Sequence, residues 1–336
     1  MFMMTELEEC ASDDTDACKE ALLCRELADQ GDPHAQYEYG CRLYKGVGTA
    51  VDIASAISYF KKAADQGHTE SMQNYACCII SSSNDSTDVA EAVKYCKMAA
   101  DQGCRYSQLN YATLVLEGVR VPQNDAEAFR YSKMAADQGC VISQYVCASL
   151  LQHSPCVEKD EAEAARYYKM SADQGFDKAQ YSYALALENG LGVTKNITEA
   201  ARYYKMAADQ GNMLAQCNYG YYLSMGMGVQ KDEALAARYY KMAADQGDSQ
   251  AQFNYAEVCI NGQGVPKNEA KAARYYKMAA DQGFVKAQYN YAVCLMKGRG
   301  VVASYEESFR YFKMAAEQGF GPAQIVCMRY FMNFVI

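Results

Sequence analysis

The clearest catalytic spacing in the chain belongs to Ser58 and Lys61, which are separated by two residues. A serine followed by a lysine at this spacing is typical of hydrolases in which the serine attacks an acyl group. The sequences Ser-Asp-Asn and Lys-Thr-Gly, which accompany the motif in those enzymes, do not occur in this chain. In helical phase both residues face water. The isolated motif therefore favours two solvent-facing side chains, and hydrolysis is kept only as an alternative.

Gly-x-Gly pairs recur along the sequence and resemble the loops that bind nucleotide phosphates. A phosphate-binding loop also needs a strand before the glycines and a third glycine within the turn, and neither is present. We therefore interpret the pairs as turns between helices. They include Gly190 and Gly192, Gly226 and Gly228, Gly262 and Gly264, and Gly298 and Gly300.

Metal and disulfide chemistry are poorly supported. His153 lies near Cys147 and Cys156, but two or three ligands on one loop do not complete a tetrahedral site. The chain has 15 cysteines and 3 histidines and contains no Cys-x-x-Cys pair. The cysteines occupy positions where other repeats carry small or apolar residues, so most are interpreted as reduced core side chains. We expect no metal and no cofactor.

One ten-residue segment, residues 202–211, organises the rest of the sequence. It recurs unchanged at 238–247 and 274–283, and near copies end at Gly31, Gly67, Gly103, Gly139, Gly175 and Gly319. All nine of these glycines follow one another at a constant period of 36 residues. A fixed period of this length predicts a solenoid, in which each repeat buries its apolar face against its neighbours.

Each repeat is predicted to be a pair of helices. The first, at 33–45 and equivalent positions, carries Ala or Ser, then Tyr, then an aliphatic residue at intervals of four, which is one helix face. A loop leads to a position that is always Asp, Asn or Ser and should cap the second helix. Five of these caps are followed by glutamate three residues on, which predicts capping boxes. The caps are Asp52, Asp88, Asn124, Asp160, Asn196, Asp232, Asn268 and Ser304, and the glutamates are Glu91, Glu127, Glu163, Glu199 and Glu307.

The predicted organisation is a single stack flanked by half-repeats. Residues 1–15 form an acidic, flexible segment, 16–31 a capping half-repeat, 32–319 eight repeats, and 320–336 a second capping half-repeat. In the first half-repeat, Leu23 and Leu27 are expected on the core face.

Composition limits where the protein acts. The formal net charge is −9 and the basic residues alternate with acids, which argues against nucleic-acid binding. The N-terminus lacks the pattern of a signal peptide, and no segment approaches 18 apolar residues. A cytoplasmic location is therefore expected, with no membrane insertion.

The repeated pattern Ala-Gln-x-x-Tyr-Ala/Gly, Gly-x-Gly-Val, Asp/Asn, Ala-x-x-Tyr-Tyr-x-x-Ala-Ala-x-x-Gly resembles the Sel1-like repeat, over residues 16–333. The resemblance implies an all-α, right-handed superhelical α/α solenoid of about eight full 36-residue repeats, related to tetratricopeptide proteins. It also implies a scaffold or adaptor for other proteins, with first helices lining the concave side. Three loops depart from the pattern, at residues 81–85, 118–120 and 154–156, and should have different shapes.

A binding surface is predicted on the first helices. The positions equivalent to 34, 38, 41 and 45 vary between repeats and lie on one face, away from the tyrosines. The second of them is mostly asparagine, whose amide could pair with the backbone of a bound peptide. Alternatively, the asparagines bond to the neighbouring helix and recur because the repeats were duplicated. The predicted groove comprises Asn74, Asn110, Asn218, Asn254, Asn290, Glu38 and an apolar patch of Ile142, Val146, Leu185, Leu214 and Tyr221.

The C-terminal half-repeat is unusually apolar. Phe331, Phe334 and Ile336 should either cover the last core or make an end-to-end contact with another protein.

The sequence thus predicts a non-catalytic scaffold that binds a peptide or partner protein of unknown identity. Two alternatives follow from the resemblance: a weak hydrolase resembling β-lactamases or penicillin-binding proteins, and an adaptor in a ubiquitin-ligase or endoplasmic-reticulum degradation complex. A third interpretation is an architectural spacer with no groove ligand.

Overall fold

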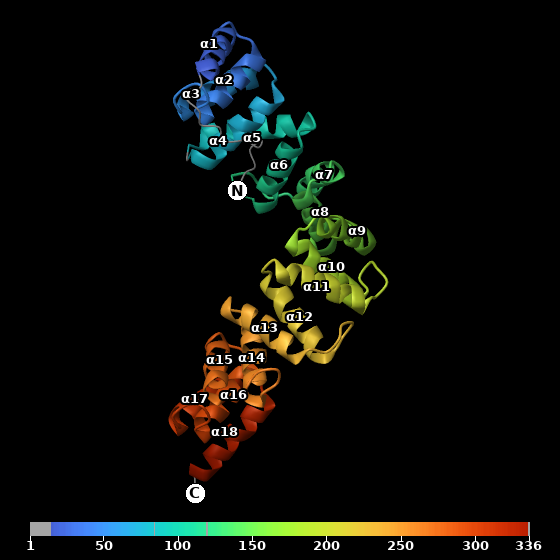
Figure 1. The fold of residues 1–336 in the computed structure, drawn as a ribbon, viewed down its shortest axis with the longest axis vertical. Helices are drawn as coiled ribbons and strands as arrows, with labels where there is room; N and C mark the ends of the chain where they lie inside the picture. Colours follow the sequence, from blue (N-terminus) through green and yellow to red (C-terminus); the bar gives the residue numbers. More distant parts are fainter. Residues whose placement is uncertain (1–14, 84, 119, 335–336) are drawn as a thin grey trace. The chain divides into compact units, whose positions relative to one another are not determined.

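The computed structural model describes residues 15–83, 85–118 and 120–334, and the side chains of 16–329 within those ranges. In this part of the chain the structure is helical throughout, with helices α1–α18 and no strand (Figure 1). The predicted all-α solenoid of helix pairs is therefore confirmed.

The helices alternate between two types. The described residues begin with a second-type helix, α1 (Thr15–Asp29), and end with a first-type helix, α18 (Gly321–Phe334). The first helices of the eight repeats are α2 (Pro33–Lys45), α4 (Thr69–Ser82), α6 (Arg105–Glu117), α8 (Val141–His153), α10 (Asp177–Asn189), α12 (Met213–Met225), α14 (Ser249–Asn261) and α16 (Val285–Lys297). The second helices are α3 (Ile53–Asp65), α5 (Ser86–Asp101), α7 (Asp125–Asp137), α9 (Glu161–Asp173), α11 (Ile197–Asp209), α13 (Glu233–Asp245), α15 (Glu269–Asp281) and α17 (Tyr305–Glu317).

The described residues fall into two compact units, divided between Met170 and Ser171 within α9. The 36-residue period continues through this division without interruption. The two units are built from the same contacts, which are described below for each unit separately.

Within a repeat, tyrosines hold the two helices together. The tyrosine of the first helix meets the edge of a tyrosine in the second, as Tyr219 meets Tyr239 with ring centroids 4.9 Å apart at 84°. Edge-to-face packing is the favoured geometry for aromatic pairs, and each ring removes a large apolar area from water. The same pair recurs as Tyr39–Tyr59, Tyr75–Tyr95, Tyr111–Tyr131, Tyr183–Tyr203, Tyr255–Tyr275 and Tyr291–Tyr311.

A chain of glutamine side chains connects one repeat to the next. Buried Gln216 in α12 donates its amide to the carbonyl of Ala208 in the preceding α11, at 3.1 Å. Its own side-chain oxygen accepts a 2.8 Å hydrogen bond from Gln246, at the end of α13. We call this arrangement the glutamine relay. It recurs with the pairs Gln36–Gln66, Gln108–Gln138, Gln180–Gln210, Gln252–Gln282 and Gln288–Gln318.

A second link joins successive second helices near the surface. The hydroxyl of Tyr239 in α13 donates to the carboxylate of Asp209, the last residue of α11, at 2.5 Å. An equivalent bond forms in all eight repeats, for the tyrosines at 59, 95, 131, 167, 203, 239, 275 and 311. The repeated Asp-Gln-Gly that ends each second helix therefore supplies two bonding side chains besides its glycine.

The helix caps agree with the sequence at seven of the eight predicted positions. The exception is Asp88, which lies inside the first turn of α5, because Asp85 caps that helix by accepting from the amide of Thr87. The loop between α4 and α5 lacks the paired glycines of most other repeats. Helix α4 therefore continues to Ser82, and α5 begins at Ser86, before the predicted cap. In the loop after α6, Arg120 has a positive φ of 71°, in the place of a loop glycine.

The predicted capping boxes do not form as expected. In a capping box the glutamate would bond the backbone amide of the cap, but that amide donates instead to a carbonyl of the first helix, as in Asn196 to Leu187 at 2.9 Å. The glutamates turn outward. Glu91, Glu127 and Glu163 pair with lysines of the preceding second helix, at 2.9, 2.6 and 2.8 Å.

The prediction for the N-terminal half-repeat is wrong in detail. Leu23 and Leu27 are exposed, whereas Ala21 and Ala28 of α1 are buried. The physical reason is that Leu23 and Leu27 occupy the positions of Tyr59 and Ala63, which pack against the first helix of their own repeat. Among the described residues no first helix precedes α1.

In the Gly-x-Gly loop between the two helices of a repeat, the second glycine should be harder to replace than the first. Gly262 and Gly264 both have positive φ, 73° and 69°, but a Cβ on Gly264 would lie 2.2 Å from the backbone of Glu233. On Gly262 it would lie 3.4 Å from the nearest atom, a side-chain carbon of Lys267. We expect Gly262→Ala to cost ~1–2 kcal/mol for its conformation alone. Gly264→Ala should cost about 1–3 kcal/mol more for the clash. Equal urea denaturation midpoints for the two variants would contradict this.

The glutamine relay should contribute measurably to stability. Gln216→Leu removes two hydrogen bonds, one to the Ala208 carbonyl and one from the Gln246 amide, each of which contributes about 0.5–1.5 kcal/mol. Gln250→Leu is the matched control, since Gln250 lies exposed on α14. Urea denaturation monitored by circular dichroism measures both variants, and we expect the control to remain within about 0.5 kcal/mol of the wild type.

Candidate interaction surface

The candidate surface consists of the first-helix positions that vary between repeats. We call it the variable face: the residues equivalent to 34, 38, 41 and 45. In the unit of residues 171–336 it is formed by α10, α12, α14 and α16, while the buried tyrosines and alanines of the same helices point toward the second helices.

Helix α12 presents the most apolar part of this face. Leu214 and Tyr221 are 45% and 46% exposed, and Met225, one turn further on, is also exposed. Asn218 lies among them, half-buried. These four residues follow the spacing i, i+4, i+7 and i+11, so they form one stripe along α12. Met225 was not among the predicted site residues, although its position in the repeat identifies it. On the adjacent α10, Leu185 is half-buried.

The asparagines of the variable face bond largely to the protein itself. Asn290 donates to Glu257 of the preceding first helix at 2.7 Å, and Asn254 lies 3.9 Å from the sulfur of Cys217. The amide of Asn218 lies near the hydroxyls of Tyr181 and Tyr204 and works to lower the pKa of both. These contacts favour the alternative in which the asparagines tie neighbouring helices together.

Half-buried carboxylates on α10 and α14 accept hydrogen bonds from buried tyrosines. The hydroxyl of Tyr276 donates to Glu257 at 2.5 Å, and that of Tyr204 donates to Glu188 at 2.5 Å. Burial, followed by the hydrogen bond to the carboxylate, raises the pKa of both tyrosines far above the ordinary value. Both hydroxyls therefore remain protonated donors, which suits a structural role.

In the unit that ends at Met170, the variable face is more closed. Asn74 and Asn110 are buried, and the amide of Asn110 lies 3.3 Å from the sulfur of Cys77. Glu38 is exposed, and Ile142 and Val146 are half-buried. Val146 lines an open cavity of about 290 Å³ with Tyr145, Leu150, His153 and Pro155, among others. The predicted groove residues are thus divided between an accessible part and a buried part.

Ser58 and Lys61 do not form a catalytic pair. Ser58 is exposed on α3, while the ammonium of Lys61 contacts Asp65, Glu91 and the hydroxyl of Tyr95 at 3.0, 2.9 and 3.2 Å. Burial lowers the pKa of Lys61, but the hydrogen bonds to Glu91 and Asp65 outweigh it and the pKa is raised overall. A lysine held in its charged form cannot accept the proton of a serine.

The cysteines of the described residues form no disulfide, and most are buried or half-buried. Burial raises the pKa of Cys41 and Cys78 to about 11 and of Cys217 to about 12, so these thiols are unreactive near neutral pH. Among the described residues no group of three or more His, Cys, Asp or Glu side chains could hold a metal ion. Nor is any described helix both long and apolar enough to cross a membrane.

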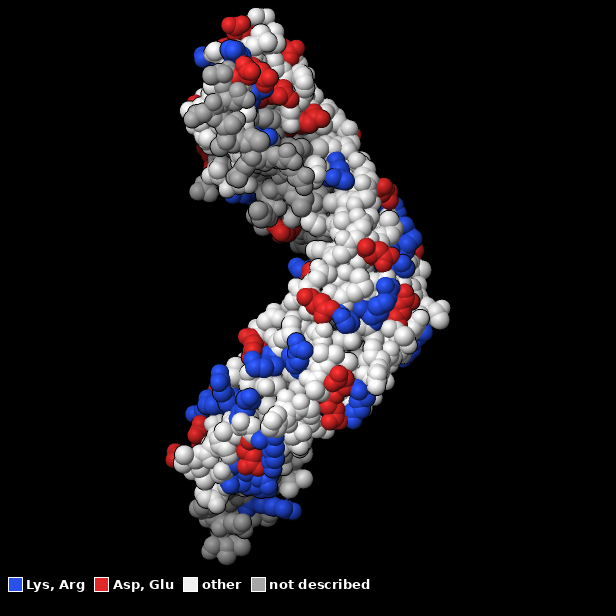
Figure 2. Space-filling model, in the orientation of Figure 1, with Lys and Arg blue, Asp and Glu red and all other residues white. Residues whose placement is uncertain are grey.

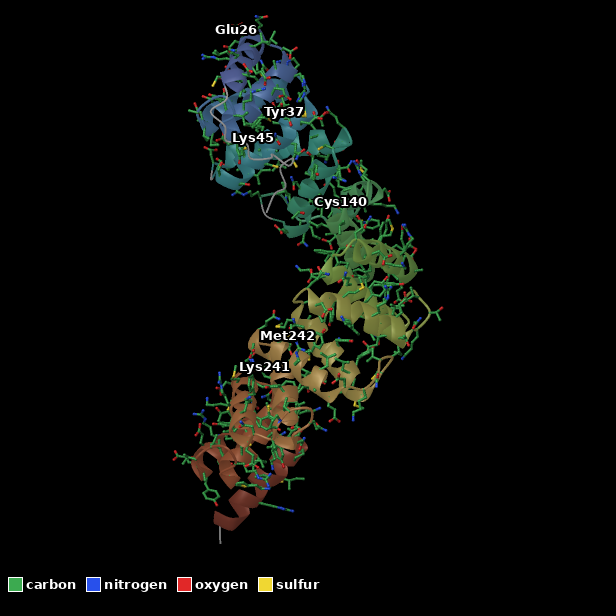
Figure 3. The ribbon with its side chains drawn as sticks, in the orientation of Figure 1. Glu26, Tyr37, Lys45, Cys140, Lys241 and Met242 are labelled. Carbon is green, nitrogen blue, oxygen red and sulfur yellow. The ribbon has the colours of Figure 1, made fainter. Side chains whose placement is uncertain are left out.

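The outer faces of the second helices carry paired charges. Lys205, Lys241 and Lys277 each lie beside the aspartate four residues on, at 2.6, 2.5 and 2.7 Å. Figure 2 shows blue and red side chains close together over much of the visible face. Met242 of α13, labelled in Figure 3 beside Lys241, is an exposed apolar residue on this outer face. The side chains of Phe331 and Phe334, and all of Ile336, lie outside the described residues.

These features define a class: an α/α solenoid of 36-residue helix pairs with one variable, partly apolar helix face. Comparison with known families identifies the class more closely. The Sel1 repeat matches eight times, at residues 33–68, 70–104, 105–140, 141–176, 177–212, 214–248, 249–284 and 285–320. The chain belongs to the Sel1 repeat family, whose members are generally protein-interaction scaffolds.

Two solved structures are similar over most of the chain. One is a protective antigen present in uropathogenic Escherichia coli strains, displaying an SLR fold. It is 28% identical, with a TM-score of 0.83 and coverage of 93% of this chain and 67% of the other. The second, a Sel1 repeat protein from Oxalobacter formigenes, is 24% identical over 98% and 96% of the two chains, with a TM-score of 0.70, and supports the fold alone. A search of curated proteins found no match.

The bond between Tyr239 and Asp209 predicts a pH dependence of stability. Burial works to raise the pKa of Asp209, but hydrogen bonds from Lys205 and Tyr239 lower it below the ordinary value. A carboxyl whose folded pKa is depressed stabilises the fold above its unfolded pKa of about 3.9 and loses that contribution as the pH falls further. Asp209→Asn should therefore be less stable than the wild type at neutral pH, by a difference that shrinks below about pH 4.

Urea denaturation at a series of pH values measures this difference. Asp209→Asn removes the titrating carboxyl while keeping an oxygen that can accept from Tyr239, so the two proteins differ mainly in charge. A stability difference that stays constant from neutral pH to about pH 3 would contradict the assignment.

Proposed function

We propose that this protein is a non-catalytic scaffold that binds a peptide or a partner protein on the variable face of α10, α12, α14 and α16. Membership of the Sel1 repeat family supports the general role. The observation that carries the proposal is the stripe of Leu214, Tyr221 and Met225 on α12, which leaves apolar side chains exposed on a helix whose opposite side is buried. Exposed apolar groups on a solenoid face favour a protein partner.

The chemistry of this face indicates what kind of partner it would bind. The apolar stripe on α12 is flanked by Lys178 of α10 and Lys286 of α16, both exposed. A segment with apolar anchors and acidic residues on either side would match this arrangement. Since the asparagine amides are largely engaged within the protein, affinity should come mainly from burial of apolar side chains.

Hydrolysis remains a weaker candidate. Its only support is the spacing of Ser58 and Lys61, and the carboxylates around Lys61 argue against a basic role for that lysine. The absence of the accompanying motifs from the sequence argues in the same direction.

The proposal is tested by selecting binders of the full-length protein from a phage-displayed library of random peptides. Leu214→Glu with Tyr221→Glu should weaken the selected peptides at least about tenfold, or ~1.4 kcal/mol, since it places two charges in the apolar stripe. Met242→Glu is the matched control, because it adds a charge at an exposed apolar residue on the outer face of α13. Equal loss in both variants would argue against the variable face.

A triple variant separates the two roles of the asparagines. If they read a peptide backbone, Asn218→Ala, Asn254→Ala and Asn290→Ala together should abolish binding without affecting stability. The bond from Asn290 to Glu257 and the position of Asn218 beside Tyr204 lead us to expect the reverse, a loss of stability of about 1–3 kcal/mol with peptide binding largely retained.

A further inference from the structure

The stacking of repeats leaves cavities at equivalent positions in the two units. Each cavity lies between the end of one first helix, the start of the second helix that follows it, and the end of the next first helix. In the unit that ends at Met170 the cavity measures about 290 Å³ and lies between α6, α7 and α8. In the unit that begins at Ser171 it measures about 230 Å³ and lies between α12, α13 and α14. Equivalent lining residues are Leu116 and Ser224, Asp125 and Glu233, Leu150 and Val258, and Pro155 and Gln263.

The first of these, which we call the α8 cavity, is lined mainly by apolar and aromatic side chains. Leu150 is buried in its wall, and Tyr145 and Val146 are half-buried. A cavity of about 150 Å³ is large enough to bind benzene. The α8 cavity therefore has room for one leucine or aromatic side chain of a ligand. Its described lining consists of Leu116, Asp125, Tyr145, Val146, Ser149, Leu150, His153, Ser154 and Pro155.

Two differences from α12 shape the α8 cavity. Ser149 stands at the position that holds the large Tyr221 in α12. The chain leaves α8 at Ser154 with an extended backbone, φ −77° and ψ 132°, whereas α12 ends at Gly226 in the left-handed conformation. The loop therefore departs from α8 in another direction and brings Pro155 to the cavity. A small side chain and a redirected loop together leave the space open.

The polar groups of the α8 cavity favour a cation beside the apolar side chain. Asp125, the first residue of α7, accepts hydrogen bonds from Ser154 at 2.7 Å and from Gln123 at 3.2 Å. Both donors are uncharged, so they leave the negative charge of Asp125 uncompensated, and a carboxylate can accept further hydrogen bonds. The neutral ring of His153 can also accept one. None of the described lining residues is Lys or Arg.

The charge of the surrounding unit acts in the same direction. Residues 1–170 contain 15 Lys and Arg against 26 Asp and Glu. A negative field of this kind raises the local concentration of cationic ligands. By contrast, Lys178 and Lys286 flank the apolar stripe on α12. The two units therefore present apolar sites that suit ligands of opposite charge.

We propose that the α8 cavity is a second ligand site, which binds a peptide segment carrying a leucine or aromatic side chain next to a lysine or arginine. The apolar side chain enters the cavity beside Val146 and Leu150, and the cation pairs with Asp125. This site lies in a different unit from the stripe on α12 and uses different residues. Binding at either site can therefore fail without the other.

The test selects peptides from a phage-displayed random library on the full-length protein carrying Leu214→Glu and Tyr221→Glu, which removes the apolar stripe of α12. The enriched peptides should share an apolar residue next to Lys or Arg. Ser149→Tyr, added to this protein, fills the cavity with the residue that α12 has at the same position. It should weaken binding of synthetic copies of the peptides at least tenfold, measured by fluorescence anisotropy. A selection without the shared pattern, or undiminished binding to the Ser149→Tyr protein, would overturn the proposal.

Ser58→Tyr is the matched control for the filled cavity. It makes the same substitution in the same unit, at an exposed position of α3, and should leave peptide binding unchanged. Circular dichroism and urea denaturation should show that both tyrosine variants remain folded. Neither outcome bears on the proposal for α10, α12, α14 and α16, because the stripe is absent from the protein used.

The role of charge is tested separately with Asp125→Asn, which keeps an oxygen that can accept from Ser154. This variant should weaken binding of a selected peptide about fivefold, but not binding of the same peptide with glutamine in place of its lysine or arginine. Glu161→Gln removes a charge at the equivalent position of α9, outside the cavity lining, and should affect neither peptide. Equal effects of Asp125→Asn on both peptides would overturn the pairing of the cation with Asp125.

Discussion

The structure depends on satisfying one buried polar group at each step of the array. Each first helix of the relay buries a glutamine side chain at a fixed position, and burying that amide without partners would cost more than a typical hydrogen bond contributes. The partners come from the second helices on either side: Gln216 donates to the Ala208 carbonyl of the preceding second helix, and its oxygen accepts from Gln246 at the end of the following one. Because these bonds require both helices in register, they fix the phase between neighbouring repeats.

This explains why the sequence of each second helix is so uniform. Asp209 bonds to the next repeat through Tyr239, and Gln210 bonds to its own repeat through Gln180. Residues that look like solvent-facing polar groups are therefore part of the contact between repeats. The variable face of the first helices takes no part in the relay, so its residues can change without disturbing the stack. Variation there, from Leu214 to Gln250 to Lys286, is what a surface with a repeat-specific role requires.

Much of the fold could be predicted because the glycine that ends each second helix recurs nine times at a spacing of 36 residues. The bounds of α2 agree with the predicted first helix at 33–45, since glycines and caps mark its ends directly. Errors arose where a residue type has two possible partners. Asp88 and Asp85 are both good caps, and only the missing loop glycines decide between them. Likewise Glu127 could bond its own helix start or Lys97, and the first helix already occupies the amide it would need.

The residues of the predicted binding surface also differ in whether the sequence allows them one environment or two. Exposure of Leu214 and Tyr221 follows from helical phase alone, which the sequence contains. The environment of the asparagines could not be predicted in this way, because helical phase places them at the edge of the variable face and not at its exposed centre. At such an edge an amide can reach either solvent or the neighbouring helix, and Asn290 reaches Glu257. A residue repeated through duplication is thus more informative about the contact between repeats than about a ligand, and specificity must lie in the positions that differ.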